Sequence, residues 1–277
     1  MSGGGDLVDG QVHTLVAELL FTTPPAVDIE RLLADVRRVL PGTELAGDGP
    51  SGPMLAHHDL EHTFADGKRV PILTVVVGPD GGAAPGSALT AERDLSQTPD
   101  PVAAAALVAR CPTSLAVAEM MGRVHEPAAR VAAFRATLLA LVDQTGSAAV
   151  WWPSSTSLVA PDELRRHDLT GLVNIQMFRI ENDPGAVVMD TLGLHVLGLP
   201  DLQCHFTGLD PNGIARILHN TAAYIFEHGD VIDDGHTVGG PDGEAWRCQY
   251  EDTLVPPHRL VLDLDPGDPH AAGTRHR

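Results

Sequence analysis

The sequence predicts an α+β fold made of two successive sheet-and-helix halves, and three observations support this prediction. The chain has 277 residues, enough for two domains of ordinary size. Apolar residues make up 43% of it and charged residues 20%, a composition typical of globular proteins. Segments with helical periodicity are interspersed with short apolar runs bounded by Gly and Pro, which indicates both helices and strands. We expect residues 12–122 to form the first half, residues 123–265 the second, and residues 1–11 and 266–277 to be disordered ends.

The first half is expected to follow the order β-α-β-β-α-β, which is the ferredoxin-like arrangement. Asp28 can cap the first helix, whose apolar residues repeat at helical spacing. Asp66-Gly67 supplies the tight turn of a hairpin, and residues 78–98 lack periodicity, which is typical of a mobile loop. The predicted elements are a strand at residues 12–21, a helix at 29–40, strands at 55–64 and 69–77, a helix at 102–110 and a strand at 114–121.

The second half is expected to be a mostly antiparallel sheet with two long helices. The first helix covers residues 127–144 and ends at Gly146. The second covers residues 211–228, with Asp210 as its cap and Gly229 as its end. The predicted strands lie at residues 148–152, 172–180, 187–197, 202–207, 246–253 and 259–264, and a short helix lies near residues 161–166.

Charge and cysteine content narrow the choice of partners and location. The formal net charge is -19 at pH 7, so nucleic acid and anionic membranes are not expected partners, because their binding depends on clustered Lys and Arg. A protein partner with a basic surface suits this charge better. Cys111, Cys204 and Cys248 form no C-x-x-C pair, which indicates a reducing compartment. With no apolar leader or long apolar run, the expected location is the cytoplasm.

His57, Asp59 and Glu61 are the first candidate metal ligands. Alternate residues of a strand share a face, so these three side chains would lie together, with His58 and His62 on the other face. Imidazole and carboxylate groups are adequate ligands for zinc, manganese or iron. No standard ligand spacing is present, and the favoured interpretation is the solvated face of an edge strand.

His195 and His205 are the second pair of candidates. A simple hairpin around Gly198 to Asp201 would place the two imidazoles opposite each other, where they could share a metal or act in acid–base chemistry. A half-buried pair of hydrogen-bonded histidines is the favoured interpretation. A third group contains Asp230, Asp233, Asp234, His236 and Asp242, but its spacing does not match a calcium loop, and a solvated loop is favoured.

Trp151 and Trp152 are candidates for binding a protein partner. Aromatic residues make up only 4% of the chain, and consecutive residues of a strand face opposite sides. One indole could therefore be exposed and contact a partner. The alternative is that both are buried.

Two segments carry a family resemblance. The run Ala149-Val150-Trp151-Trp152-Pro153-Ser154-Ser155 and the run Thr191-Leu192-Gly193-Leu194-His195-Val196-Leu197-Gly198-Leu199-Pro200-Asp201-Leu202 resemble an uncharacterised bacterial family, domain of unknown function number 4261. The resemblance covers mainly residues 114–265. It implies no activity, cofactor or site residue.

The sequence is compatible with two functions. Motifs for nucleotide binding and for a serine nucleophile are absent, so the chain is first expected to be a non-catalytic binding or accessory protein, of the immunity type found beside bacterial toxins. No cofactor is then expected. The alternative is a metal-dependent hydrolase that uses the histidines and carboxylates named above.

Overall fold

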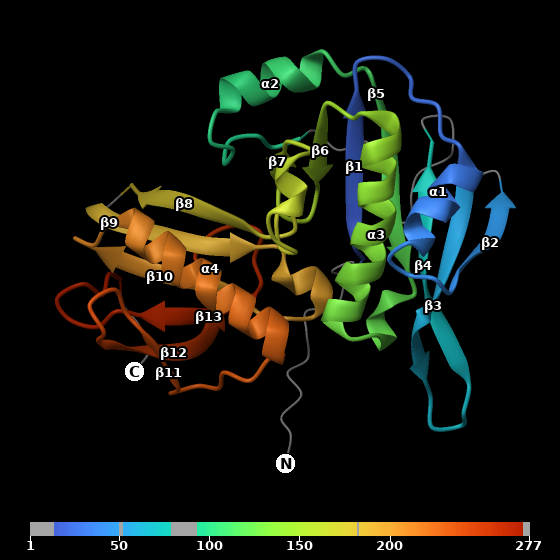
Figure 1. Ribbon diagram of the computed structural model, residues 1–277. Coiled ribbons are helices and arrows are strands. Elements are labelled where there is room, and N and C mark those ends of the chain that lie inside the picture. Colours follow the sequence, from blue (N-terminus) through green and yellow to red (C-terminus); the bar gives the residue numbers. More distant parts are fainter. Residues whose placement is uncertain (1–13, 50–51, 79–92, 182, 274–277) are drawn as a thin grey trace. The chain divides into compact units, whose positions relative to one another are not determined.

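The computed structural model describes residues 14–49, 52–78, 93–181 and 183–273. Residues 12–172 form one compact unit, the N-terminal unit, and residues 173–277 belong to a second, the C-terminal unit. Each unit contains one β-sheet together with helices (Figure 1). The predicted α+β class is confirmed. Within the described residues, no helix is both long enough and apolar enough to cross a membrane.

The N-terminal unit is built on a seven-stranded sheet in which every neighbouring pair of strands is antiparallel. The predicted hairpin is confirmed as β3 and β4, and Gly67 in its turn has a φ of 81°, which favours glycine. In spatial order the strands are β2 (Thr43–Gly49), β3 (Gly52–Thr63), β4 (Arg69–Val77), β5 (Thr113–Met120), β1 (Val16–Phe21), β6 (Ala149–Trp152) and β7 (Ser157–Val159).

Helices cover both faces of this sheet. Helices α1 (Ile29–Arg37) and α3 (Pro127–Thr145) contact each other, and α3 also contacts β3, β4 and β5 (Figure 1). Gly146 ends α3 in the left-handed conformation, as its position after the apolar pattern predicts. Helix α2 (Pro101–Ala109) packs Leu107 and Val108 against Trp151. The described residues of this unit also form two short 3-10 helices, Gly122–Val124 and Glu163–Arg165.

The C-terminal unit is built on a six-stranded sheet that helix α4 (Pro211–His228) covers through contacts with β8, β9 and β10 (Figure 1). Only the β10–β13 pair is parallel among the neighbouring strands described, so the predicted mostly antiparallel sheet is confirmed. Helix α4 has the predicted bounds, and the Asp210 carboxylate caps it by accepting from the Asn212 backbone N–H. In spatial order the strands are β11 (Thr237–Gly239), β12 (Ala245–Asp252), β13 (Leu260–Asp265), β10 (Asp201–Thr207), β9 (Asp183–Leu192) and β8 (Asn174–Ile180).

The predicted ferredoxin-like order is not confirmed. Strand β2 stands between α1 and β3 and was not predicted. Its sequence, TELAGDG, has one large apolar residue, Leu45, which is itself 42% exposed. An edge strand of this kind buries too little apolar surface to leave an alternating pattern. In addition, β1 lies between β5 and β6 and does not pair with β4.

The predicted boundary at residues 122 and 123 lies inside the N-terminal unit. Strand β6 pairs with β1, and α3 is tied to β5 by the buried Arg130–Glu119 pair, in which Arg130 Nη2 lies 2.7 Å from Glu119 Oε2. These contacts join segments that are distant in sequence, so local composition gives no sign of them. Because α3 lies in the N-terminal unit, the described residues of the C-terminal unit contain one long helix, α4, and not the two predicted for the second half.

The end of β9 and the segment after β13 differ from the predictions. The predicted strand at 187–197 ends at Leu192, because Gly193 adopts a φ of 136° and a 3-10 helix, Leu194–Leu197, follows. Residues 266–273 are ordered, since the Thr207 N–H donates to the His270 carbonyl and the Ala272 N–H donates to the His205 carbonyl. Residues 1–11 and 274–277, predicted to be disordered, lie outside the described residues, as does most of the loop predicted at 78–98.

Candidate functional site

His57 is fully buried in the N-terminal unit and serves the interior of the fold. Its Nδ1 lies 3.0 Å from Thr43 Oγ1, and its Nε2 lies 2.9 Å from Thr74 Oγ1. The Thr74 hydroxyl continues the chain to Thr137 of α3, 3.0 Å away. Burial lowers the pKa of His57 to about 4, so the imidazole is neutral at pH 7 and links two strands and a helix.

Asp59 and Glu61 do not join His57 in a common site. The register of β3 and β4 shifts between His57 and His62, which breaks the strict alternation on which the shared face was predicted. Asp59 accepts the Gly42 backbone N–H at 2.7 Å. Glu61 instead pairs with Arg69 at 2.7 Å and with the exposed His58 at 2.6 Å.

His195 and His205 are not opposite each other either. His205 lies on β10 opposite Val188 of β9, whereas His195 lies on the 3-10 helix that follows β9. The left-handed Gly193 takes the chain out of the sheet before His195, so the simple hairpin register cannot extend that far. Among the residues that the structure describes, no three His, Cys, Asp or Glu side chains are grouped so as to hold a metal ion.

Trp151 and Trp152 are both buried, with 4% and 1% of their surface exposed. Trp151 belongs to the cluster that α2 covers, and Trp152 packs against Phe134 of α3, with 5.5 Å between the ring centroids. Since helices lie on both sides of β6, neither indole is available to a partner, and the predicted aromatic surface is not formed by these two residues.

The C-terminal unit contains a buried polar network that was not predicted, and the candidate His195 is part of it. Asp201 is fully buried at the start of β10. Its Oδ2 lies 2.9 Å from His195 Nδ1 and accepts from Arg259 Nε at 2.9 Å. Its Oδ1 accepts the Leu194 backbone N–H at 2.9 Å. Burial disfavours the Asp201 anion, but the hydrogen bond and charge of His195 and the charge of Arg259 hold the pKa of Asp201 below its usual value.

Arg259 connects this carboxylate to a second one. Its Nη2 donates to Asp190 Oδ2 at 2.8 Å and to the Thr191 carbonyl at 2.7 Å. Burial raises the pKa of Asp190 to about 6, against the opposing effect of Arg259, and Asp190 Oδ1 has no hydrogen-bond partner among the described residues. One guanidinium thus serves two buried carboxylates.

His195 in this network has a fixed orientation. A buried carboxylate that holds one ring nitrogen sets the tautomer and direction of an imidazole, which is the arrangement found in acid–base sites. The side chain of His195 is 18% exposed. His195 lies on the 3-10 helix after β9, and its hydrogen bond to Asp201 links this helix to the start of β10.

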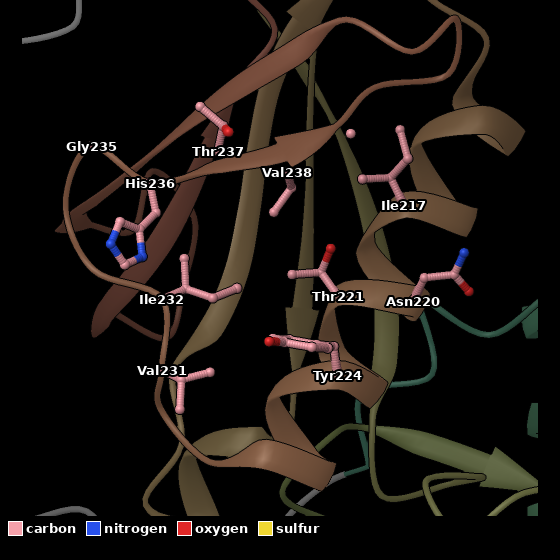
Figure 2. Close-up of a pocket in the computed structure, with 11 residues that line it drawn as sticks. Ile217, Asn220, Thr221, Tyr224, Val231, Ile232, Gly235, His236, Thr237 and Val238 are labelled. Atoms are coloured by element: carbon pink, nitrogen blue, oxygen red, sulfur yellow. The ribbon is translucent and has the colours of Figure 1, made fainter.

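A groove of about 640 Å³ lies between α4 and residues 231–239 of the C-terminal unit (Figure 2). Ile217, Asn220, Thr221 and Tyr224 line it from α4. Figure 2 shows Thr221 and Tyr224 reaching from the helix toward the segment that carries Ile232 and Val238. Tyr224 and Val231, which line the groove, are 47% and 46% exposed. A concave surface that combines apolar and hydrogen-bonding groups is typical of binding sites.

Hydrogen bonds from residues 230–236 hold the non-helical wall of the groove in place. The Tyr250 hydroxyl donates to Asp230, and the Tyr250 backbone N–H donates to Asp234 Oδ1 at 2.6 Å. Burial and the neighbouring carboxylate of Asp230 raise the pKa of Tyr250, so its hydroxyl stays protonated as a donor. The Asp233 N–H donates to His236 Nδ1 at 3.1 Å. The carboxylates of Asp230 and Asp234 therefore brace the wall of the groove.

The sequence contained only a partial signal for this groove. The spacing of Ile217, Thr221 and Tyr224 along α4 places them on one helix face, but the same pattern is typical of a buried face. The short strand β11 has no apolar run that would separate it from the loop around it.

Comparison with known proteins adds one family match. Residues 190–265 match the family model described as "Domain of unknown function (DUF4261)". The matched segment begins at Asp190 of the buried network and includes the whole groove, and it is narrower than the resemblance expected over residues 114–265. The chain has no match to a curated protein or to a solved structure.

Proposed function

We propose that the chain is a non-catalytic binding or accessory protein that acts through contact with another protein, and that the groove between α4 and residues 231–239 is its contact surface. The main support for this proposal is the exposure of Tyr224 and Val231 on a concave surface. Hydrogen bonds brace the wall of this groove that faces α4. A preformed surface loses little conformational entropy on binding. Tyrosine is also among the residues that most often dominate the free energy of protein contacts.

Charge supports a partner with a basic surface. Residues 173–277 contain sixteen Asp and Glu and only six Arg, with no Lys. Asp230, Asp233 and Asp234 are exposed and lie in the segment that leads to the groove-lining Gly235. Opposite charge on the partner would speed association and disfavour acidic competitors.

Photo-cross-linking from inside the groove tests this proposal. Benzoylphenylalanine replaces Tyr224 in the full chain, and Val102, an exposed apolar residue of α2 in the other unit, carries the same probe as the control. In a lysate of the source cells, we expect one dominant protein to be captured from position 224 and not from position 102. With that protein purified, Tyr224→Asp should weaken binding by at least about tenfold, because a charged group would replace an aromatic ring that the partner covers in the complex.

Val102→Asp should leave the affinity of the purified pair unchanged. The proposal is contradicted if the two cross-linking positions capture the same proteins, or if the captured protein binds Tyr224→Asp and the natural chain equally well.

A further inference from the structure

We infer that the groove binds an extended segment of the partner protein. This segment pairs with the open edge of β11 as an additional strand and presents Lys or Arg side chains to the exposed carboxylates of Asp230, Asp233 and Asp234. This inference rests on the proposed function and deepens it. The groove is bounded on one side by a helix and on the other by the outermost strand of a sheet, which is the setting in which peptides bind by strand addition.

The hydrogen-bond pattern of β11 shows which of its backbone groups point away from β12. Cys248 N donates to the His236 carbonyl, and Gly240 N donates to the Glu244 carbonyl, both at 2.8 Å. Bonded pairs alternate along an antiparallel ladder, so Val238 forms the bonded pair between them with Trp246. The N–H and C=O groups of Thr237 and Gly239 therefore point away from β12.

These outward groups are open to a ligand. Within the described part of the chain, no hydrogen bond joins the backbone of Thr237 or Gly239 on the side away from β12. Both residues line the groove, and a Cβ placed on Gly239 would meet no atom within 4 Å. An edge strand with unpaired backbone groups is a template for another strand.

The chemistry of the groove favours a basic segment. Alternate side chains of an added strand would face α4, where Ile217 and Thr221 offer apolar and hydroxyl contacts. The Tyr224 ring stacks on His228 with 4.3 Å between centroids, which fixes an aromatic surface at this end of the groove. An aromatic ring with exposed carboxylates nearby suits a Lys or Arg side chain, through both cation–π attraction and charge.

Selection of random dodecapeptides on the immobilised full chain tests the inference. We expect selected peptides to carry Lys or Arg, and we would synthesise one and measure its affinity by fluorescence anisotropy. Thr237→Pro removes an N–H that points away from β12 without removing a bond to β12, so it should weaken peptide binding by at least about tenfold. Thr237→Ala is the matched control, because it keeps that N–H, and it should bind within about twofold of the natural chain.

A second measurement uses the natural chain and does not depend on the folding of the variant. Methylation of single peptide amides should weaken binding at every second position only, because alternate amides of a strand face its neighbour. Amide exchange of Thr237 and Gly239 should also slow when the peptide is bound. Equal effects at successive positions, or no selected peptide at all, would overturn the inference.

The remaining outcomes separate the inference from the function on which it rests. If a captured partner depends on Tyr224 but not on Thr237→Pro or on a period of two in the methylation series, strand addition is wrong and the binding function stands. If no partner depends on Tyr224, the binding function itself is wrong. Self-association of the purified chain that Thr237→Pro abolishes would identify a second copy as the occupant and would overturn the choice of a basic partner.

Discussion

At the residue scale, the side chains of β3 that resembled metal ligands in the sequence are hydrogen-bonded to other groups of the protein. His57 is the clearest case, because a run of histidines and carboxylates suggested a shared face, while the structure gives its imidazole two threonine hydroxyls. A sequence shows which residues could bind a metal, but not whether a hydroxyl from another strand satisfies them first. Thr43 and Thr74 lie 14 and 17 positions from His57, and no local pattern connects them.

Replacement of His57 tests this structural role. His57→Ala removes a buried ring and leaves two hydroxyls without their partner, so we expect the free energy of unfolding of the N-terminal unit to fall by about 2–4 kcal/mol. His58→Ala, next to it on the same strand, should cost less than about 1 kcal/mol because the contact of His58 with Glu61 is exposed. Urea denaturation measures both values, and elemental analysis of the same samples should show no metal that His57→Ala removes. A stoichiometric metal lost with His57 would contradict the assignment.

At the element scale, strong periodic patterns were predictable and contacts across the sequence were not. Helix α4 has the expected bounds because its cap, its apolar face and its terminal glycine all agree. Strand β2 was missed because it has no apolar pattern of its own. The 3-10 helix that carries His195 was predicted as strand because its apolar residues continue those of β9. The network around Arg259 was missed for a different reason: its partners Asp190 and Asp201 lie 69 and 58 positions away.

Arg259 joins the start of β13 to β9 and β10, and its loss should affect all three strands. Arg259→Met leaves two carboxylates buried without a cation, so we expect the C-terminal unit to lose about 3–5 kcal/mol. Arg247→Met, at an exposed position on β12, should change stability by less than about 0.5 kcal/mol. The two variants are compared by urea denaturation, and adding Asp190→Asn to Arg259→Met should restore part of the loss. A loss of the same small size in both single variants would show that the network does not support the sheet.

At the scale of the whole molecule, the two units carry buried groups with opposite responses to pH. Composition predicted two sheet-bearing parts correctly, but the division falls after Leu172, because α3 and β6 complete the first sheet. Each unit therefore has its own interior, and each interior contains a titrating group. His57 lies in the N-terminal unit and Asp190 in the C-terminal unit.

The signs of the two effects follow from the direction of each pKa shift. Folding lowers the pKa of His57 from 6.5 to about 4, so its contribution to stability is complete above pH 6.5 and is lost as the pH falls toward 4. Folding raises the pKa of Asp190 from 3.8 to about 6, so its contribution is complete below pH 3.8 and is lost as the pH rises through 6. At roughly 1.4 kcal/mol per pKa unit, each shift changes the free energy of unfolding by about 3 kcal/mol across its pH range.

Fluorotryptophan labelling can separate the two units in one sample, because Trp151 and Trp152 lie in the N-terminal unit and Trp246 in the C-terminal unit. In urea titrations followed by fluorine NMR, lowering the pH from 6.5 toward 4 should shift the transition of Trp151 and Trp152 to lower urea and that of Trp246 to higher urea. His57→Gln should flatten only the first trend, and Asp190→Asn only the second. Transitions that move together in the natural chain would mean that these two buried groups do not control how each unit responds to acid.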